Sequence, residues 1–291
     1  EAAPADAPAA EASAAVPGGA TPTGAGAPEP AGGGFGAGAP DDQEMPLADH
    51  VEEMIKRLAV VVVIMAVISA FVFPFADRVI NFLWYSFLPG VAENCPPPTA
   101  VGDTASQACP RVYHPLSLML ARLKTASLVG LVIALPVFVY ETYLFMRPGL
   151  YPNERRYYLA AVPTSLVLAS VGVGFAYFLV LPVIFTYFLG YSLHAVDTIA
   201  FSLSQTFDLI LLMMGLFAVV FQIPLFIMLA IMMGVTTRRW LVDRRLYFWG
   251  GFLGIAFLFS PDPTGMAPFI VAITMVVLFE GTLLLLRWTG R

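Results

Sequence analysis

The chain has 291 residues, of which 58% are hydrophobic and 12% charged, and its formal net charge at pH 7 is −5. Soluble domains carry about 25% charged residues, so an ordinary cytosolic enzyme is excluded, and the acidic balance excludes a nucleic-acid-binding protein. Two cysteines and three scattered histidines argue against a zinc site or another metal centre. The composition predicts an all-α polytopic membrane protein that needs no cofactor.

Residues 1–45 consist almost entirely of Ala, Pro, Gly, Ser, Thr and acidic residues. Such a segment has too little apolar surface to offset its ordering entropy, so we predict that it is disordered. It lacks the basic start and the apolar run of a signal peptide. Because the first residue is Glu1, the chain is either processed or part of a longer polypeptide in which this tail is a linker, and we favour the linker.

Six apolar runs in residues 46–291 are predicted to be the transmembrane helices of one membrane domain. They lie at about 58–76, 117–146, 157–189, 203–233, 246–260 and 266–286. Pro163, Pro182 and Pro224 lie inside these runs and predict kinks. The fifth run reaches only about 22 Å, less than the roughly 30 Å of a hydrocarbon core. Either residues 240–245 extend this helix, or the bilayer is thinner beside it.

The distribution of Lys and Arg predicts the orientation of the chain. If the N-terminus is cytoplasmic, six spans return the C-terminus to the same side. Most basic residues then flank the inner ends of the helices, as the positive-inside rule requires. These inner residues are Lys56, Arg57, Arg147, Arg155, Arg156, Arg238, Arg239, Arg244, Arg245, Arg287 and Arg291.

The longest outer loop, about 77–114, contains Cys95 and Cys109. A disulfide is chemically permitted outside the cell, and closing a loop of about 15 residues contributes about 3 kcal/mol in the entropy model. The pair is therefore a disulfide candidate. Two unpaired thiols are the alternative.

The segment before the first run is predicted to form an amphipathic helix that lies on the inner membrane surface and runs into the first span. The reason is that Leu47, Val51, Met54, Ile55 and Leu58 share one apolar face. Asp49 and Glu52 resemble an N-terminal capping pair. His50, Glu53 and Arg57 share the polar face. An isolated Glu53 would be an ordinary solvated charge, but this one lies at the lipid boundary.

The first inner loop, residues 145–156, carries a second acidic residue. Asn153 is positioned to cap a helix that starts at Glu154, and Glu154 would then suit the positive end of that helix dipole. The functional alternative is that Glu154 is a second carboxylate on the inner face.

Several motifs together resemble the TatC family, the signal-receptor subunit of the twin-arginine protein translocase. The resemblance covers about residues 46–287 and is specific as an ordered set rather than motif by motif. The motifs are Pro46-Leu-x-x-His50-x-x-Glu53, Arg147-Pro-Gly-Leu-Tyr-x-x-Glu154-Arg-Arg156, Phe175-Ala-Tyr-Phe, Phe221-Gln-Ile-Pro224, Ser260-Pro-Asp-Pro263 and Leu278-Phe-Glu280.

The resemblance implies a concave, non-enzymatic six-helix receptor with cytoplasmic termini in the cell membrane. It implies that Glu53 and Glu154, with His50 beside them, bind the consecutive arginines in the signal peptides of folded cargo. It also implies single-span partners of the TatA or TatB type, other copies of the receptor, and energy from the proton-motive force. Guanidinium binds carboxylate in a two-pronged geometry that Lys cannot copy, which agrees with this assignment.

Other polar residues lie within or beside the apolar runs. Much of the family has a glutamate where this chain has Gln222, so an interhelical hydrogen bond is the simplest role for the amide. Asp208 and Gln222 are also candidate partner contacts. Glu280 is predicted to be a polar anchor between helices, and Glu141 to reach water near the inner interface. Asp262 matches a family motif, although the stretch from Asp262 to Glu280 is about two residues longer than expected.

Two other functions were weighed. A secondary transporter would show paired, inverted halves with broken helices in both, and only the second half here has a short helix. An intramembrane hydrolase would need His-Glu-x-x-His or Gly-x-Ser-x-Gly, and the sequence contains neither.

Overall fold

The computed structural model describes residues 47–87, 113–150, 152–193, 202–260 and 265–288. The chain divides into Glu1–Ala37 and Gly38–Arg291, and every described residue belongs to the second unit. The predicted tail, Cys95, Cys109 and Asp262 lie outside the described residues.

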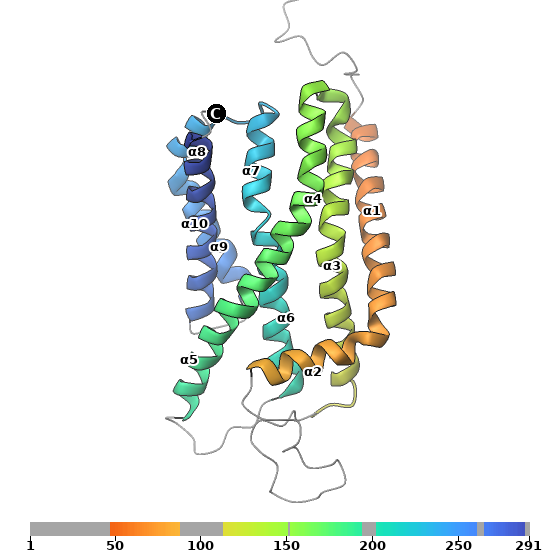
Figure 1. Ribbon diagram of the computed structural model, residues 1–291, viewed down its shortest axis with the longest axis vertical. Coiled ribbons are helices and arrows are strands. Elements are labelled where there is room, and N and C mark those ends of the chain that lie inside the picture. Colours follow the sequence, from red (N-terminus) through yellow and green to blue (C-terminus); the bar gives the residue numbers. More distant parts are fainter. Residues whose placement is uncertain (1–46, 88–112, 151, 194–201, 261–264, 289–291) are drawn as a thin grey trace, which may run out of the picture. The chain divides into compact units, whose positions relative to one another are not determined.

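The elements of the described part of the chain are all helices (Figure 1). They are α1 (Leu47–Val72), η1 (Phe73–Phe75), α2 (Ala76–Phe87), α3 (Ser117–Met146), η3 (Arg147–Gly149), α4 (Pro152–Phe175), η4 (Ala176–Val180), α5 (Leu181–Leu193), α6 (Leu203–Val220), α7 (Ile223–Met232), α8 (Arg238–Asp243), α9 (Arg245–Phe259) and α10 (Met266–Trp288).

Among the described residues, five helical stretches are long and apolar enough to cross a bilayer. They are Ala48–Phe87, Ser117–Met146, Arg155–Phe188, Leu203–Met232 and Met266–Trp288. A sixth apolar helix, α9, is shorter. It does not gain length from its N-terminal flank, because Arg244 interrupts the helix between α8 and α9. The predicted short fifth helix is therefore present, and the extension by residues 240–245 is wrong.

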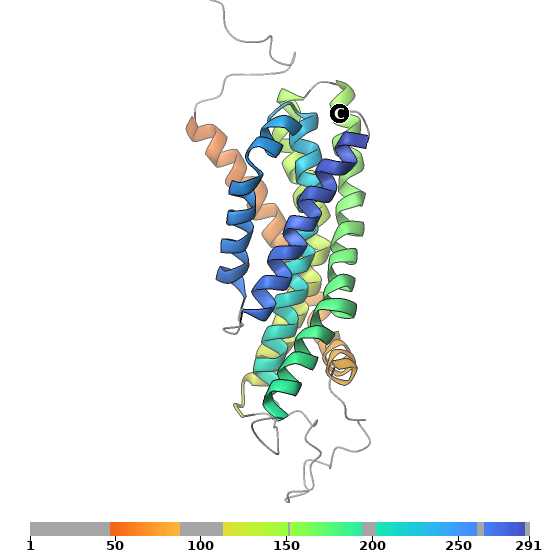
Figure 2. The same ribbon diagram turned by 90° about the vertical axis from the view of Figure 1, so that its left-hand side faces the viewer.

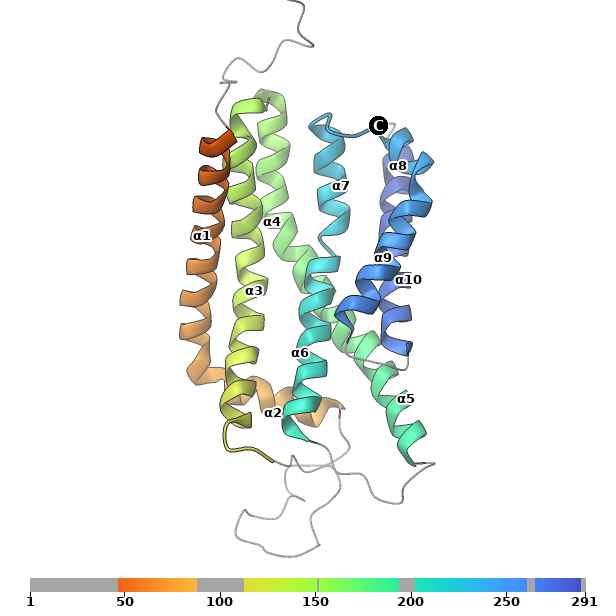
Figure 3. The same ribbon diagram turned by 180° about the vertical axis from the view of Figure 1, so that it is seen from behind.

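The first turn of α1 and the last turn of α10 lie at the same end of the helix bundle (Figures 1 and 3). The connection from α3 to α4 and the end of α7 lie at this end too, whereas α2 and the start of α6 lie at the opposite end. The basic residues that flank these helix ends are thus gathered at one end of the bundle. We call it the basic end.

Two predicted helix caps near the basic end are wrong. The amphipathic segment runs into the first span as expected, and the two form one helix, α1. This helix begins at Leu47, so Asp49 lies in its first turn rather than at its N-cap. Likewise α4 begins at Pro152, a residue that suits the first helical position because its missing N–H needs no partner there. Asn153 is therefore inside the helix.

The predicted outer loop contains a helix that the sequence interpretation missed. In Figure 1, α2 runs across the end of the bundle, and in Figure 2 it is seen end-on. It buries Ile80, Leu83 and Trp84, which recur at helical spacing. The Trp84 ring stacks on Phe207 of α6, with 6.0 Å between the ring centroids. This packing fixes α2 against the bundle.

Two of the predicted kinks appear as local departures from α-helix. Between α4 and α5 the backbone forms a π-helical turn over Ala176–Val180, just before Pro182. The fourth span is broken between α6 and α7, just before Pro224. Proline has no N–H to donate to the preceding turn, which explains this second break.

Two glycines allow close contacts between helices of the bundle. A Cβ at Gly130 of α3 would lie 2.9 Å from the carbonyl oxygen of Met65 in α1. A Cβ at Gly172 of α4 would lie 2.9 Å from the carbonyl carbon of Phe217 in α6. Membrane helices associate through such close backbone packing because lipid offers no hydrophobic driving force between them.

Candidate functional site

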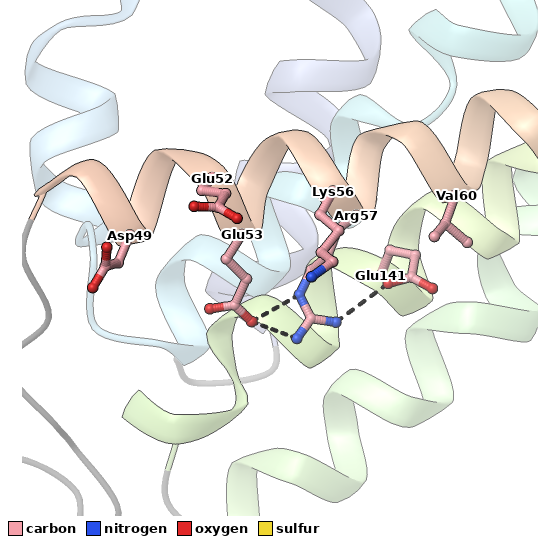
Figure 4. A pocket seen from close by; sticks show the side chains of 7 residues that line it. All are labelled: Asp49, Glu52, Glu53, Lys56, Arg57, Val60 and Glu141. Carbon is pink, nitrogen blue, oxygen red and sulfur yellow. Dashed lines mark hydrogen bonds and ion pairs between the residues drawn. The ribbon is translucent and has the colours of Figure 1, made fainter.

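A charged cluster joins α1 to α3 near the basic end (Figure 4). Arg57 donates from Nε and Nη2 to Glu53 Oε1, at 3.1 and 2.5 Å. Its Nη1 donates to Glu141 Oε2 of α3 at 3.3 Å. One guanidinium therefore lies between two carboxylates that are 88 positions apart in the sequence.

Local helix geometry explains half of this cluster. Glu53 and Arg57 are separated by four residues, so successive turns of α1 bring them to the same face. The other half needs tertiary packing, because Glu141 reaches Arg57 only where α1 and α3 run side by side. Gly130 lets the two helices approach closely further along the same contact.

The cluster lines an open hollow of about 630 Å³. The hollow is lined by Asp49, Glu52, Glu53, Lys56, Arg57, Val60 and Glu141. Four carboxylates thus face two cations. The exposed fraction of the side chain falls from 32% at Glu53 to 26% at Arg57 and 15% at Glu141. Glu53 is therefore the accessible end of the cluster, and Glu141 is the sheltered end.

His50 lies one turn before Glu53 and contacts the end of α3. Its ring is 4.6 Å from the ring of Phe145, measured between centroids. The imidazole thus fixes the first turn of α1 against the last turn of α3. Among the described residues no hydrogen bond joins His50 to Glu53, so the structure supports a packing role for it.

Glu154 is the third residue of α4. Its side chain lies outside what the structure describes. The backbone still places Glu154 at the basic end, because α4 starts directly after the turn that follows α3. In the turn before α4, Leu150 is buried. Its carbonyl oxygen accepts a hydrogen bond from Arg155 Nε of α4 at 3.2 Å.

Comparison with known proteins decides the family. Residues 49–273 match the family described as Sec-independent protein translocase protein (TatC). This chain belongs to the TatC family. It is 57% identical over 283 residues to TatCo of Haloferax volcanii, covering 90% of this chain and 62% of that protein. It is 32% identical over 249 residues to TatC of Methanocella arvoryzae, covering 86% of this chain and 96% of that protein.

A solved structure agrees with this assignment. The crystal structure described as twin arginine translocase receptor TatC superimposes with a TM-score of 0.68 at 25% sequence identity. The superposition covers 83% of this chain and 100% of the other. The all-helical fold and the TatC assignment predicted from the sequence are therefore confirmed, and the chain is a multi-pass membrane protein. It spans 62% of the length of the Haloferax relative.

In this TatC-family chain Gln222 lies at the break between α6 and α7. Its Nε2 donates to the carbonyl oxygens of Ser165 in α4, at 3.1 Å, and of Ala218, at 3.2 Å. The backbone N–H of Gln222 turns to Val219 instead, so the side chain replaces the donor that Ala218 would receive in a continuous helix. The predicted interhelical bond is therefore present. Only 1% of the residue is exposed, which argues against the predicted contact of Gln222 with a partner.

The remaining predicted polar residues form pairs between helices. Asp208 of α6 accepts from Lys124 Nζ of α3 at 2.6 Å, and both side chains are 46% exposed. Glu280 of α10 accepts from Trp249 Nε1 of α9 at 3.2 Å, which agrees with its predicted role as an anchor between helices.

The sequence interpretation missed Glu141 as a member of the cluster. It placed Glu141 near the inner interface and expected it to reach water, whereas the structure pairs it with Arg57. The available signal was an acidic residue inside an apolar run, since such charges usually face a partner inside the bundle. Which cation it meets could not be read from the sequence.

Proposed function

We propose that this chain is a receptor for the twin-arginine signal peptides of folded proteins and performs no catalysis itself. The observation that carries the proposal is the contact between Glu53 and Arg57. A carboxylate that already holds a guanidinium, in an open and acidic hollow, has the chemistry needed to bind an arginine of another chain.

Two neighbouring arginines call for two carboxylates, and we assign the second role to Glu154. Each guanidinium can form two parallel, charge-assisted hydrogen bonds to a carboxylate. A lysine ammonium is a compact point charge and lacks this forked arrangement of donors. Partial burial strengthens such bonds by lowering the local dielectric constant. Each lost contact is expected to weaken binding by about 1.5–3 kcal/mol, as for hydrogen bonds to charged groups.

We further propose that the basic end faces the cytoplasm and that both ends of the bundle domain lie there. The gathering of Arg and Lys at this end supports that orientation through the positive-inside rule. The membrane would be the cell membrane. We keep Asp262, which matches a family motif, as a candidate for a structural polar residue or a partner contact after the fifth helix.

The partners we propose are single-span subunits of the TatA or TatB type and other copies of the receptor, with transport driven by the proton-motive force. A mostly apolar hollow of about 840 Å³ lies beside α3, α6 and α9, which gives an apolar partner segment a surface to contact. Asp208 and Lys124 line the same hollow and would meet polar groups of such a partner.

Crosslinking tests the assignment of the two carboxylates. A signal peptide with two consecutive arginines and a photoreactive label is added to membranes that contain the wild-type chain, Glu53→Gln, Glu154→Gln or both. We expect crosslinking to fall at least about tenfold in each single variant, as the loss of one such bond implies. Glu52→Gln is the matched control, because Glu52 lines the same hollow but makes no ion pair with Arg57 among the described residues. Undiminished crosslinking in the double variant would overturn the site.

A further inference from the structure

The pairing of Arg57 with its two carboxylates is uneven. Two of its nitrogens converge on one oxygen of Glu53, Oε1. Within the described part of the chain no donor reaches the other oxygen, Oε2. The contact with Glu141 uses a single nitrogen and is longer, at 3.3 Å. Arg57 therefore binds mainly to Glu53 and leaves Glu141 with capacity to accept more hydrogen bonds.

Arg57 occupies the carboxylate that the proposed function requires. A guanidinium from a signal peptide has to share Glu53 with Arg57 or displace it. Arg57 cannot leave the cluster, because it belongs to α1 and the next turns of this helix expose apolar side chains such as Val60 and Val63. A charge without a partner at this boundary would be expensive.

Glu141 offers the displaced guanidinium a partner. It already contacts Arg57, and it is the most sheltered of the three side chains, so a ligand entering from the open hollow meets Glu53 first. A small side-chain rotation of Arg57 would exchange its hydrogen bonds from Glu53 to Glu141 without any movement of the helices.

We propose that Arg57 is a resident guanidinium that occupies Glu53 in the free receptor, and that Glu141 is a positioning residue that takes Arg57 over when an arginine of the ligand binds Glu53. This inference rests on the proposed function and deepens it. The ligand arginine then replaces an existing guanidinium contact, and only a group that competes for a carboxylate as well as Arg57 does can enter. Glu141 sets how easily this exchange happens.

The exchange predicts a specific pattern of affinities. In Glu141→Gln the positive charge of Arg57 stays on Glu53, so affinity for the arginine-pair peptide falls about tenfold, the scale of one nearby unit charge in a partly solvated site. In Arg57→Gln the competitor is gone and affinity is equal to or higher than that of the wild type. In Arg57→Gln combined with Glu141→Gln affinity returns to within about threefold of the wild type, because neither the competitor nor its acceptor is present.

The experiment measures binding of a fluorescent arginine-pair signal peptide to the purified full chain in nanodiscs, by anisotropy. Glu52→Gln, alone and with Arg57→Gln, is the matched control. It removes the same charge from the same hollow without a contact to Arg57, so we expect an effect of about twofold or less and additive behaviour with Arg57→Gln. The thermal unfolding midpoint of Glu141→Gln in the same nanodiscs shows directly whether the single variant is folded.

The outcomes separate the inference from the function on which it rests. If the wild type binds and Glu53→Gln does not, but Glu141→Gln binds like the wild type, the exchange is overturned and the receptor function stands. The same holds if Arg57→Gln weakens binding as much as Glu53→Gln, since Arg57 would then help the ligand rather than compete with it. If the wild-type chain does not bind the peptide, both proposals fail.

Discussion

Gly172 of α4 packs directly against the carbonyl group of Phe217 in α6. A Cβ at position 172 would lie 2.9 Å from the carbonyl carbon of Phe217 and 3.1 Å from Cβ of Phe221. Phe217 is completely buried, so its backbone cannot retreat into free space. The crossing of α4 and α6 thus depends on the absence of a side chain at position 172.

The first prediction concerns this crossing. Gly172→Ala should destabilise the chain by about 1–3 kcal/mol, the usual range for an overpacked core. The matched control is Gly174→Ala, two residues later on the same helix, where an added Cβ has no neighbour within 4 Å. It should be neutral or slightly stabilising, because Ala favours helix over Gly. Thermal unfolding in detergent measures the stability of both variants. Equal unfolding midpoints would refute the claim that the α4–α6 crossing has no room for a side chain at position 172.

A second prediction concerns Gln222. Gln222→Ala removes the bond to Ser165 and leaves the carbonyl of Ala218 without the donor that replaces the helical one. We expect a loss of about 0.6–1.7 kcal/mol, because interhelical hydrogen bonds in membranes contribute about 0.6 kcal/mol on average and up to about 1.7. Thr164→Ala is the control, because Thr164 bonds only to Ala160 of its own helix in the described structure. Thermal unfolding measures both variants. If Gln222→Ala unfolds at the same temperature as Thr164→Ala, the Gln222 amide does not stabilise the packing of α4 against α6.

A third prediction concerns the pair of Lys124 and Asp208. Both side chains are nearly half exposed, so Asp208→Asn should change the unfolding free energy by less than about 1 kcal/mol. Because the pair lines the large apolar hollow, the same substitution should reduce photocrosslinking to a TatA- or TatB-type helix severalfold. Asp77→Asn is the control, since it breaks another exposed ion pair, with Arg122, away from the hollow. Equal crosslinking in the two variants would exclude Asp208 as a partner contact.

A fourth prediction concerns the ligand. Replacing both arginines of the signal peptide by lysines should lower its affinity at least about tenfold, because ammonium lacks the forked donors that match a carboxylate. The measurement is a titration of both peptides at one ionic strength, since exposed charges are screened by salt. Equal affinity for the two peptides would mean that net charge, rather than guanidinium geometry, is recognised.

The helices of the bundle could largely be read from the sequence. Residues 117–146 were predicted as a span and form α3 with the same bounds, because a long, mostly apolar run has few other stable conformations in a membrane. The π-helical turn before Pro182 and the break before Pro224 follow from proline chemistry in the same way. In contrast, α2 was missed although Ile80, Leu83 and Trp84 have helical spacing, because a short helix beside Pro-rich sequence resembles a loop until it has a surface to pack on.

The candidate site was predicted only in part. The sequence places Glu53 and Arg57 on one helix face, since four residues make about one turn. It could not place Glu141 beside them, because an ion pair across 84 positions depends on which helices become neighbours and at what height.

The sequence by itself determined that this chain is a helical membrane protein of the TatC family with most of its basic residues near one set of helix ends, because hydropathy, charge and ordered motifs are properties of the chain alone. Only the tertiary structure decided that Arg57 is shared by two carboxylates, that Gln222 completes a broken helix, and that α2 lies across the bundle. These features depend on distances between helices, and close contacts at positions such as Gly130 and Gly172 set those distances.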